Sequence, residues 1–430
     1  MNRLVPLLSL WLLLAPCACN QPTKDDAAAG ETAKTEKATS EPGGPSKVDA
    51  AAAPNVVEPG EGDPEEAEAE PPDTAPEEAP ILGDEGVEGA GDGTAIDPSA
   101  VADSIAAIDG VLEGERYDLF WGSKEDPPAE ELHGITPEFE GRHYVYGDEY
   151  NLQLFYPKVK DLGGAYVGVG ADQAYITIAW QKPELAWLID YDEWVVSIHA
   201  AYRVFFSLAK TADEFRGFWD KDNEDATLAL LDKELADHPK LQLIKKLYKA
   251  NRGGLRYRMT RLQKTFEAAK VPYVFYDQEA YEVVRNLVLQ KRIRPLLANL
   301  LDDEGMVGIG AAAEALNVPI RVLYVSNAEE YWNYEDQYRA NINALFFDEK
   351  SILMRTLSTW KRNKDYQYAV QGAQNYAGWL TRKWVERVSY IVQRQAVSSP
   401  DETPFIETTL DIETAEANRA ARKERKKKGK

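Results

Sequence analysis

Between residues 103 and 398, short apolar runs alternate with longer stretches in which apolar residues recur every three or four positions. Short runs bounded by turn residues are typical of buried strands, and the longer period is typical of amphipathic helices. The strands predicted in this way cover residues 165–169, 185–189, 271–276, 293–301, 320–325, 344–347 and 352–357, the last two as a hairpin. The predicted helices cover residues 98–112, 174–181, 193–210, 222–250, 310–316 and 365–396, with two more that begin after Thr211 and Asp277.

This alternation predicts an α/β protein. Strands that alternate with helices form a mostly parallel sheet with helices on both faces. We therefore expect a Rossmann-like, doubly wound sheet over residues 103–398, closed by an antiparallel edge at its C-terminal side. Residues 103–160 precede the first predicted strand, and their later part is irregular and rich in tyrosine, so we expect a segment that covers the domain.

Residues 1–19 have the pattern of a secretory signal. Arg3 precedes the apolar run Leu4–Ala15, which is shorter than the roughly 20 apolar residues that a membrane-spanning helix needs. Cys19 stands at the end of this run, as the acylated cysteine does in a bacterial lipoprotein signal, and Cys17 is the alternative. The prediction is an exported protein with a lipid anchor in the bacterial cell envelope, on its periplasmic or surface face. An ordinary cleaved signal is the simpler alternative.

Residues 20–102 are predicted to be a disordered linker. They are rich in Ala, Glu, Asp, Pro and Gly, and no aromatic residue occurs between Trp11 and Tyr117. Such a chain buries too little apolar surface to offset the entropy of folding. Its net charge, −17 over residues 21–100, favours an extended spacer, with attraction of cationic partners as the alternative.

Residues 399–430 are predicted to be a flexible tail that is basic from residue 419 onward. Arg419–Lys430 carries a net charge of +7. Such a tail is attracted to an anionic membrane surface or to the acidic linker, and it is equally compatible with a solvated end that binds nothing.

Composition excludes several classes of function. The formal net charge is −23, so no broad basic face is available for nucleic acid. The only two cysteines precede residue 20, which excludes a disulfide scaffold and a cysteine-based zinc site in the later domain. The four histidines, at positions 133, 143, 199 and 238, form no metal-binding pair, and we expect no metal.

A glycine turn after the strand 165–169 is the main candidate for cofactor binding. Glycine there lets the backbone approach a ligand, a helix N-terminus offers N–H groups, and an acid about 20 residues later accepts from a ribose. Gly170 and Asp190 have this separation, and Gln173 stands where a third glycine is usual. The candidate residues are Gly168, Gly170, Asp172, Gln173, Asp190 and Asp192. A tight turn without a nucleotide is the alternative, because two glycines at such a turn are common in α/β proteins.

Further polar residues follow the later predicted strands. The carboxyl ends of parallel strands meet at one edge of the sheet, so we expect these side chains to line a cleft there. The cleft residues predicted are Asn299, Asp302, Ser326, Asn327, Glu330 and Tyr331. The arginine-rich stretch 252–261 is interpreted as a solvated helix face paired with nearby acids, with anion binding as the alternative.

The segments Gly164–Ile176, Leu188–Asp190 and Val322–Tyr331 resemble a poorly characterised group of bacterial and plant proteins. Members of this group are similar in fold to S-adenosylmethionine-dependent methyltransferases. The resemblance covers roughly residues 140–357, and it implies a methyltransferase-like fold with a cleft at these loops. It does not imply a reaction.

Two functions follow from these observations. The first is an envelope lipoprotein whose methyltransferase-like domain binds a small ligand or another envelope protein without catalysis. The second is a methyltransferase that takes S-adenosylmethionine or a related nucleoside as cofactor. Export favours the first, because the methyl donor is made in the cytoplasm. Hydrolysis has no support, since no Gly-x-Ser-x-Gly motif is present, and no catalytic residue can be assigned.

Overall fold

The structure is a computed structural model that describes residues 110–132 and 141–428. The predicted signal, the linker and most of the helix 98–112 lie outside these residues, so their predictions are untested. Both described ranges belong to one unit that spans Asp92–Lys430.

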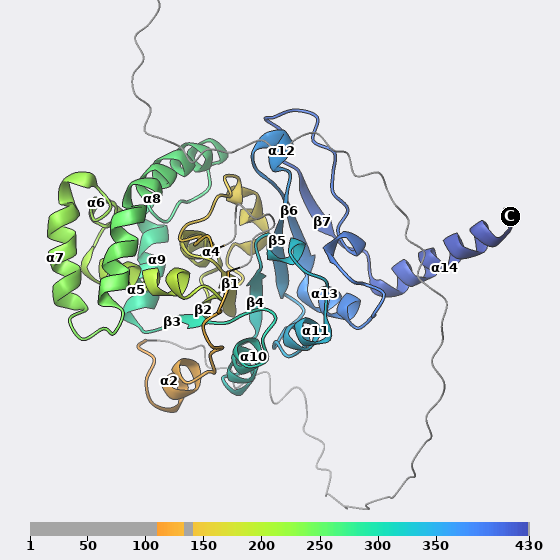
Figure 1. Cartoon of the computed structure of the whole chain (residues 1–430), viewed down its shortest axis with the longest axis horizontal. Coiled ribbons are helices and arrows are strands. Elements are labelled where there is room, and N and C mark those ends of the chain that lie inside the picture. Colours follow the sequence, from red (N-terminus) through yellow and green to blue (C-terminus); the bar gives the residue numbers. More distant parts are fainter. Residues whose placement is uncertain (1–109, 133–140, 429–430) are drawn as a thin grey trace, which may run out of the picture. The chain divides into compact units, whose positions relative to one another are not determined.

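Seven strands in the described residues form one sheet in the order β3-β2-β1-β4-β5-β6-β7 (Figure 1). The strands are β1 (Ala165–Val169), β2 (Leu185–Asp190), β3 (Ile293–Leu297), β4 (Ile320–Tyr324), β5 (Ile352–Ser358), β6 (Tyr366–Gly372) and β7 (Phe405–Thr408). The first five strands run parallel, β6 is antiparallel to β5, and β7 is parallel to β6. The prediction of an α/β fold with a mostly parallel sheet and an antiparallel C-terminal edge is therefore confirmed.

The helices of the described residues cover both faces of this sheet. The α-helices are α2 (Gly114–Trp121), α3 (Tyr156–Val159), α4 (Asp172–Gln181), α5 (Glu193–Leu208), α6 (Ala212–Gly217), α7 (Glu224–Glu234), α8 (Leu241–Ala269), α9 (Gln278–Leu289), α10 (Gly305–Ala315), α11 (Asp336–Asn343), α12 (Trp360–Asn363), α13 (Ala373–Leu380) and α14 (Ile412–Lys428). Short 3₁₀ turns are η2 (Leu152–Phe155), η3 (Lys221–Asn223), η4 (Ala328–Glu330) and η5 (Val388–Tyr390).

The direction of winding reverses between β1 and β4. Tyr166 and Leu188 face one hydrophobic core, built with α4, α5, α8 and α9. Val167 and Trp187 face a second core, built with α2, α10, α11 and α13. Since helices that follow β1 and β2 cover one face and helices that follow β3 and β4 cover the other, the gap between the carboxyl ends of β1 and β4 is a topological switch point, the place where open α/β sheets bind ligands.

Local signals set several helix starts as predicted. The Thr211 hydroxyl accepts from the Glu214 N–H at the start of α6, and the Asp277 carboxylate accepts from the Ala280 N–H at the start of α9. Side-chain caps of this kind satisfy backbone donors that a helix leaves unpaired. These helices are confirmed.

Two predicted strands are wrong. Residues 271–276 form turns between α8 and α9, where the Trp180 indole donates to the Pro272 carbonyl and holds the segment in the core. Residues 344–347 end α11 and continue as a loop, so β5 pairs with β6 instead. In both places an apolar run is buried by packing against helices, which apolarity alone does not distinguish from a strand.

The long helix predicted over residues 365–396 is also wrong. Residues 366–372 form β6, which pairs with β5 along seven residues, and a helix follows only over α13. Tyr366, Tyr368 and Val370 alternate with Gln or Ala in this stretch, which suits a strand between two neighbours, and pairing with β5 overrides its helical spacing.

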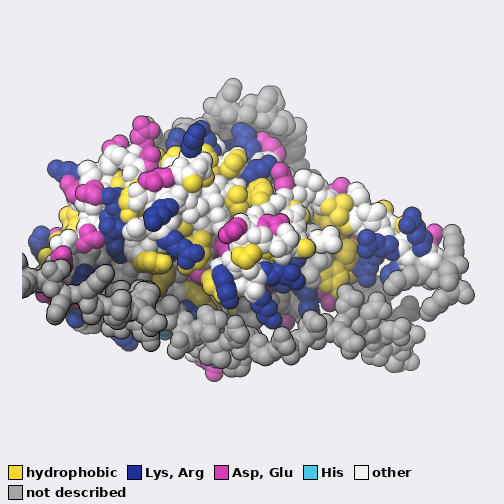
Figure 2. Space-filling view, turned by 90° about the horizontal axis from the view of Figure 1, so that it is seen from above, with side chains coloured by type: hydrophobic (Ala, Val, Ile, Leu, Met, Phe, Trp, Pro, Cys, Tyr) yellow, Lys and Arg dark blue, Asp and Glu magenta, His cyan; other side chains and the backbone are white. Residues whose placement is uncertain are grey.

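Part of the predicted flexible tail forms regular elements in the structure. It contains β7 and α14, whose first turn is capped by Asp411 and buries Ile412 and Ala415 against the core. Beyond that turn the helix is mostly exposed, and Figure 2 shows Lys and Arg side chains gathered at this end of the chain. No helix among residues 110–132 and 141–428 is long and apolar enough to cross a membrane.

Candidate functional site

The glycine turn connects β1 to α4 and lies against the end of β2. Gly170 has a φ of +86°, a conformation that favours glycine, and its N–H donates to the Ile189 carbonyl over 3.2 Å. The Asp190 carboxylate accepts from the backbone N–H of Asp192 at 3.0 Å and lies close to the backbone N–H of Gly170. The structure thus brings the predicted pair Gly170 and Asp190 together.

Side chains of the protein itself cover both glycines. A Cβ at Gly170 would lie 2.1 Å from Nε2 of Gln173, whose amide folds back over the turn. A Cβ at Gly168 would lie 2.1 Å from the hydroxyl of Tyr166. Internal packing is therefore sufficient to require glycine at these two positions.

Asp172, at the start of α4, is closed in a buried ion pair. Its carboxylate accepts from Arg258 Nε at 2.7 Å and from the Gly147 N–H at 2.8 Å. Arg258 extends from α8, and its Nη1 donates to the Glu149 carbonyl at 2.7 Å. Both charged side chains are buried, and the nearby acids raise the pKa of Arg258 against the effect of burial, so the guanidinium stays charged. Asp172 thereby holds the loop around residue 147.

Residues 144–151, here called the switch-point segment, lie across the carboxyl ends of β1 and β4. The Glu149 carboxylate accepts from the Tyr324 hydroxyl and from Ser326 Oγ, both at 2.6 Å. Ser326 is a predicted cleft residue, so two of the predicted strand-end groups, Ser326 and Asp172, meet through this segment. The segment fills the crevice in which a nucleotide would lie.

Three buried polar atoms of this cluster point at one place. A Cβ at Gly147 would lie 2.7 Å from Glu149 Oε2, 2.9 Å from Arg258 Nη2 and 3.1 Å from Gln173 Oε1. None of the three atoms has a hydrogen-bond partner among the described residues. A side chain at position 147 would clash with the glutamate and the arginine, so the packing of this cluster requires glycine there.

Two acids of the site have pKa values near neutrality. Burial raises the pKa of Asp148 to about 6, with Glu149 adding to the shift and the Tyr366 hydroxyl opposing it. Burial likewise raises the pKa of Asp190 to about 7, and the N–H groups that it accepts from oppose the rise. These carboxyls can hold or release a proton near neutral pH.

Asp192, which follows β2, caps α5. One carboxylate oxygen accepts from the Trp194 N–H at 2.8 Å, and the other lies 2.8 Å from Nδ1 of His143. The His143 ring stacks on Trp194 with centroids 3.7 Å apart. The Asp192 carboxylate is therefore engaged by the start of α5 and by His143, which precedes the switch-point segment.

Asn299 and Asp302 lie apart from the switch point. The Asn299 amide donates to Asp302 over 3.1 Å, and its N–H donates to Asp126, which also caps α10. Asn341 of α11 donates to the Asp302 carbonyl at 2.6 Å. These groups close the β3–α10 loop on the second face of the sheet.

The remaining predicted residues border an open cleft beyond β4 and β5. Its volume is about 660 Å³, within the range of small-molecule sites. The lining residues are Glu329, Glu330, Tyr331, Trp332, Asn333, Leu357, Arg387, Val388, Ser389, Val392, Gln393 and Arg394. Among the predicted cleft residues, Glu330 and Tyr331 line it directly, and the Asn327 side chain lies close to Tyr331. We call it the β4–β5 cleft.

The β4–β5 cleft carries both signs of charge. Glu330 accepts from the Ser358 N–H at 2.8 Å and pairs with Arg394, and burial raises the pKa of Glu330 above its ordinary value. Arg387 is exposed and has no ion pair with another described residue. An anionic group on a ligand could bind Arg387 without displacing an internal acid.

Behind the cleft lies a buried network around Glu329. Its Oε1 accepts from the hydroxyls of Tyr334, Tyr338 and Tyr376, and its Oε2 lies 3.1 Å from Nη1 of Arg355. These side chains are buried, so the network fixes the wall formed by η4.

The sequence interpretation missed Asp148, Glu149 and Arg258. Arg252 and Arg256 pair with acids at the surface as predicted, at 3.0 Å from Glu224 and 2.6 Å from Asp220. Arg258 instead lies on the apolar stripe of α8 between Leu255, Leu262 and Phe266, all buried. An arginine on an apolar stripe was the available signal, because a charge there needs a buried partner.

Comparison with known proteins identifies a family for this chain but no activity. No curated protein matches the chain significantly. Among the described residues, no group of three or more His, Cys, Asp or Glu side chains is arranged to hold a metal ion. The sequence profile of a Domain of unknown function (DUF7790) matches residues 144–409, from the switch-point segment to the end of β7. The match covers more than half of the chain, and the protein therefore belongs to this family.

Proposed function

We propose that this protein is an exported lipoprotein of the bacterial cell envelope whose α/β domain binds a small ligand in the β4–β5 cleft. The signal-like residues 1–19 and Cys19 support export and anchoring. The acidic, aromatic-free residues 20–102 support a spacer between the anchor and the domain.

The strand order supports a Rossmann-like, methyltransferase-like fold. The order 3-2-1-4-5 with winding reversed between β1 and β4 is that of doubly wound nucleotide-binding sheets. The antiparallel β6 next to β5 distinguishes this sheet from an all-parallel one.

Binding without methyl transfer is the function that the geometry supports best. The observation that carries it is the contrast between the occupied switch point and the open β4–β5 cleft. Gln173 covers Gly170, Tyr166 packs against Gly168, and the switch-point segment lies across the carboxyl ends of β1 and β4, where sheets of this order bind nucleotides. The cleft offers about 660 Å³, with Arg387 exposed at its edge.

A thermal-shift screen of small polar metabolites tests this function on the full-length chain. A ligand at 100-fold excess over its dissociation constant stabilises a protein by about 2.7 kcal/mol. We expect at least one hit whose shift is lost in Arg387→Ala. The hit should persist in Lys264→Ala, a matched charge removal on the exposed face of α8. A set of hits that all survive Arg387→Ala would contradict binding in the cleft.

The second candidate function is an S-adenosylmethionine-dependent methyltransferase. The contact between Gly170 and the Asp190 carboxylate favours it, because a nucleoside-binding turn needs this acid beside the glycine. Calorimetry with S-adenosylmethionine and S-adenosylhomocysteine decides between the two functions. Binding that is abolished by Asp190→Ala would establish the second, and no heat with either nucleoside would end it.

The anchor is tested by metabolic labelling with an alkyne fatty acid. Cys19→Ser should abolish the label and release the protein from membranes, whereas Cys17→Ser should retain both. The opposite pattern would assign the lipidation site to Cys17. Unchanged labelling in the variant that carries both substitutions would contradict lipidation of either cysteine.

The basic end of α14 is proposed to contact an anionic membrane surface. The exposed residues of this helix include Arg422, Lys423 and Arg425, and each basic residue near such a surface adds about 1 kcal/mol. The full-length chain and a chain ending at residue 418 are compared on anionic and neutral vesicles. Equal retention by both chains in low salt would exclude this contact.

A further inference from the structure

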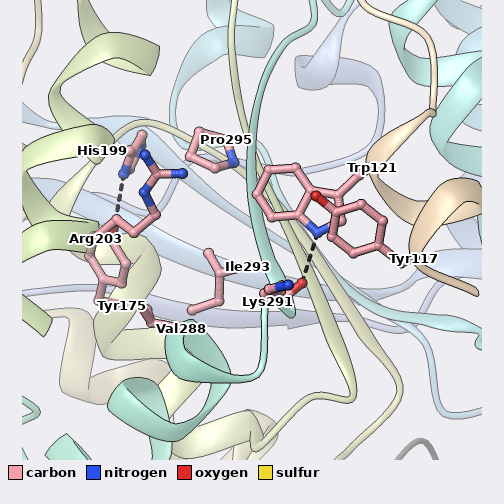
Figure 3. Close-up of a pocket in the computed structure, with 9 residues that line it drawn as sticks. All are labelled: Tyr117, Trp121, Tyr175, His199, Arg203, Val288, Lys291, Ile293 and Pro295. Carbon is pink, nitrogen blue, oxygen red and sulfur yellow. Dashed lines mark hydrogen bonds between the residues drawn. The ribbon is translucent and has the colours of Figure 1, made fainter. Parts of the chain in front are cut away.

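A second pocket lies beside the edge strand β3, on the side of the sheet away from the β4–β5 cleft (Figure 3). Its volume is about 290 Å³. The lining residues come from α2, α4, α5, α9, β3 and the turn between α9 and β3: Tyr117, Trp121, Tyr175, His199, Arg203, Val288, Lys291, Ile293 and Pro295. We call it the β3 pocket.

One wall of the β3 pocket is apolar and rigid. In Figure 3, Tyr117 and Trp121 stand on one side and Ile293 and Pro295 lie between them and His199. The Trp121 indole donates to the Lys291 carbonyl at 2.9 Å, and the Tyr117 and Trp121 rings stack with centroids 5.8 Å apart. Flat rings held in place in this way are suited to a flat apolar partner.

Helix α2 is fixed to the edge strand, so this wall is preformed. Arg294 of β3 donates to the Phe120 carbonyl at 2.9 Å, and the Phe120 ring lies 4.8 Å from the ring of the buried Trp187. A preformed wall lowers the entropy lost when a ligand binds.

The opposite wall is polar but neutral. His199 Nε2 donates to the Gly170 carbonyl at 3.3 Å, and Nδ1 lies 2.8 Å from the Tyr175 hydroxyl, from which it accepts. Burial lowers the pKa of His199 to about 4, so the ring carries no charge at neutral pH. Among the described residues, no acidic side chain lines the pocket.

Both cations of the pocket are available to a ligand. Arg203 and Lys291 are exposed, and neither forms an ion pair with an acid in the part of the chain that the structure describes. Lys291 Nζ instead lies 5.4 Å from the centre of the Tyr117 ring. Acids outnumber bases in this chain by 72 to 49, so partners for basic side chains are plentiful. Two basic side chains beside one pocket without an acidic partner among the described residues therefore suggest an external anion as the partner.

We propose that the β3 pocket binds a small aromatic carboxylate. The ring packs between Trp121 and the apolar side chains of β3, and the carboxylate binds Arg203 and Lys291. This site is separate from the β4–β5 cleft and does not depend on the function proposed for it. Because His199 bonds to Gly170, the ligand contacts the wall that supports the glycine turn.

The test uses 2-naphthoate and its uncharged analogue 2-naphthamide with the full-length chain. Isothermal titration calorimetry should give at least tenfold tighter binding of the acid than of the amide. Arg203→Gln and Lys291→Asn should each weaken the binding of the acid about three- to fivefold and leave the affinity for the amide unchanged. Asparagine suits position 291, where φ is +60°.

Three controls keep the result decisive. Lys264→Gln removes a charge elsewhere and should change neither affinity. Arg203→Glu, at an exposed position, should abolish binding of the acid while the thermal unfolding midpoint stays unchanged. Trp121→Leu should weaken acid and amide together. Equal affinity for acid and amide, no binding of the acid up to its solubility limit, or unchanged affinity in Arg203→Glu would each overturn the proposal.

Discussion

Asp172 and Glu330 are both acids that follow a parallel strand and pair with an arginine, but their surroundings differ. In the Asp172–Arg258 pair the side chains are 1% and 3% exposed, and both also bond to the switch-point segment. In the Glu330–Arg394 pair the arginine is 58% exposed at the edge of an open cleft. The first pair holds the fold together, and the second is free to exchange partners.

The difference follows from desolvation. A buried charge needs a fixed partner, because water no longer compensates it, so the groups at the switch point are committed to one another. An exposed ion pair contributes little free energy, so an exposed arginine loses little when it leaves its internal acid to bind a ligand. An acid at the end of a strand therefore indicates a ligand site only where the arginine that pairs with it is exposed to solvent.

The largest expected effect is at the buried pair. Arg258→Met keeps the volume but leaves Asp172 without its partner, and it should lower the free energy of unfolding by about 3–5 kcal/mol. Urea denaturation measures this loss. Arg394→Met at the cleft is the matched control and should lose less than about 1 kcal/mol. Equal losses in the two variants would remove the distinction between the two sites.

The next effect tests why Gly170 is glycine. Gly170→Ala places a Cβ against Gln173 at a positive φ, and it should destabilise the fold by about 1–3 kcal/mol. Adding Gln173→Ala should recover the part due to the contact and leave the backbone strain. Chemical denaturation measures both variants.

Gly253→Ala is the control for this substitution, because Gly253 lies within α8 with open space around it. Alanine there should stabilise the helix by up to about 1 kcal/mol. If Gly170→Ala were as harmless as Gly253→Ala, the glycine turn would not be packed as described.

Asp190 should make stability depend on pH. Its pKa is raised to about 7 in the fold, so between about pH 4 and 7 the folded chain holds a proton that the unfolded chain releases. Stability from this group is complete below pH 4 and is lost as pH rises to 7, by about 1–2 kcal/mol at an incompletely buried site.

Asp190→Asn should remove this dependence, and thermal unfolding across pH 4 to 8 measures it. Asp303→Asn, at an exposed position, should leave the wild-type profile unchanged. His199 acts in the opposite direction, because its lowered pKa causes stability to fall below about pH 6.5. The comparison is therefore between each variant and the wild type, and parallel profiles for Asp190→Asn and wild type would contradict the assignment.

The smallest effect on stability is expected in the cleft. Arg387→Gln should change the free energy of unfolding by less than about 0.5 kcal/mol, since the side chain is exposed and has no internal ion pair among the described residues. The same variant should abolish the ligand-induced thermal shift. A loss of stability with binding intact would reverse the roles assigned to the two sites.

Much of the fold was predictable from local signals. β1 was predicted at its observed bounds, and β2, β4 and α5 within one or two residues, because apolar runs and caps act within a few positions. The aromatic spacing of β6 fits both the helical and the strand period, and only pairing with β5 selects the strand.

The candidate site was predictable in part. Gly170, Asp190, Ser326 and Glu330 were found from their places after predicted strands. Arg258 and Glu149 were not, since they reach the switch point from α8 and from an irregular segment. Contacts between residues that lie far apart in the sequence leave no local pattern from which they could be predicted.

The sequence by itself determined the alternation of strands and helices, the segregation of acidic and basic ends, and the positions of the polar strand ends. Only the tertiary structure decided that the switch point is filled from within while the β4–β5 cleft stays open. Periodicity and capping depend on neighbouring residues, whereas filling a crevice depends on side chains that reach it from elements more than 80 positions away, such as Arg258 at Asp172.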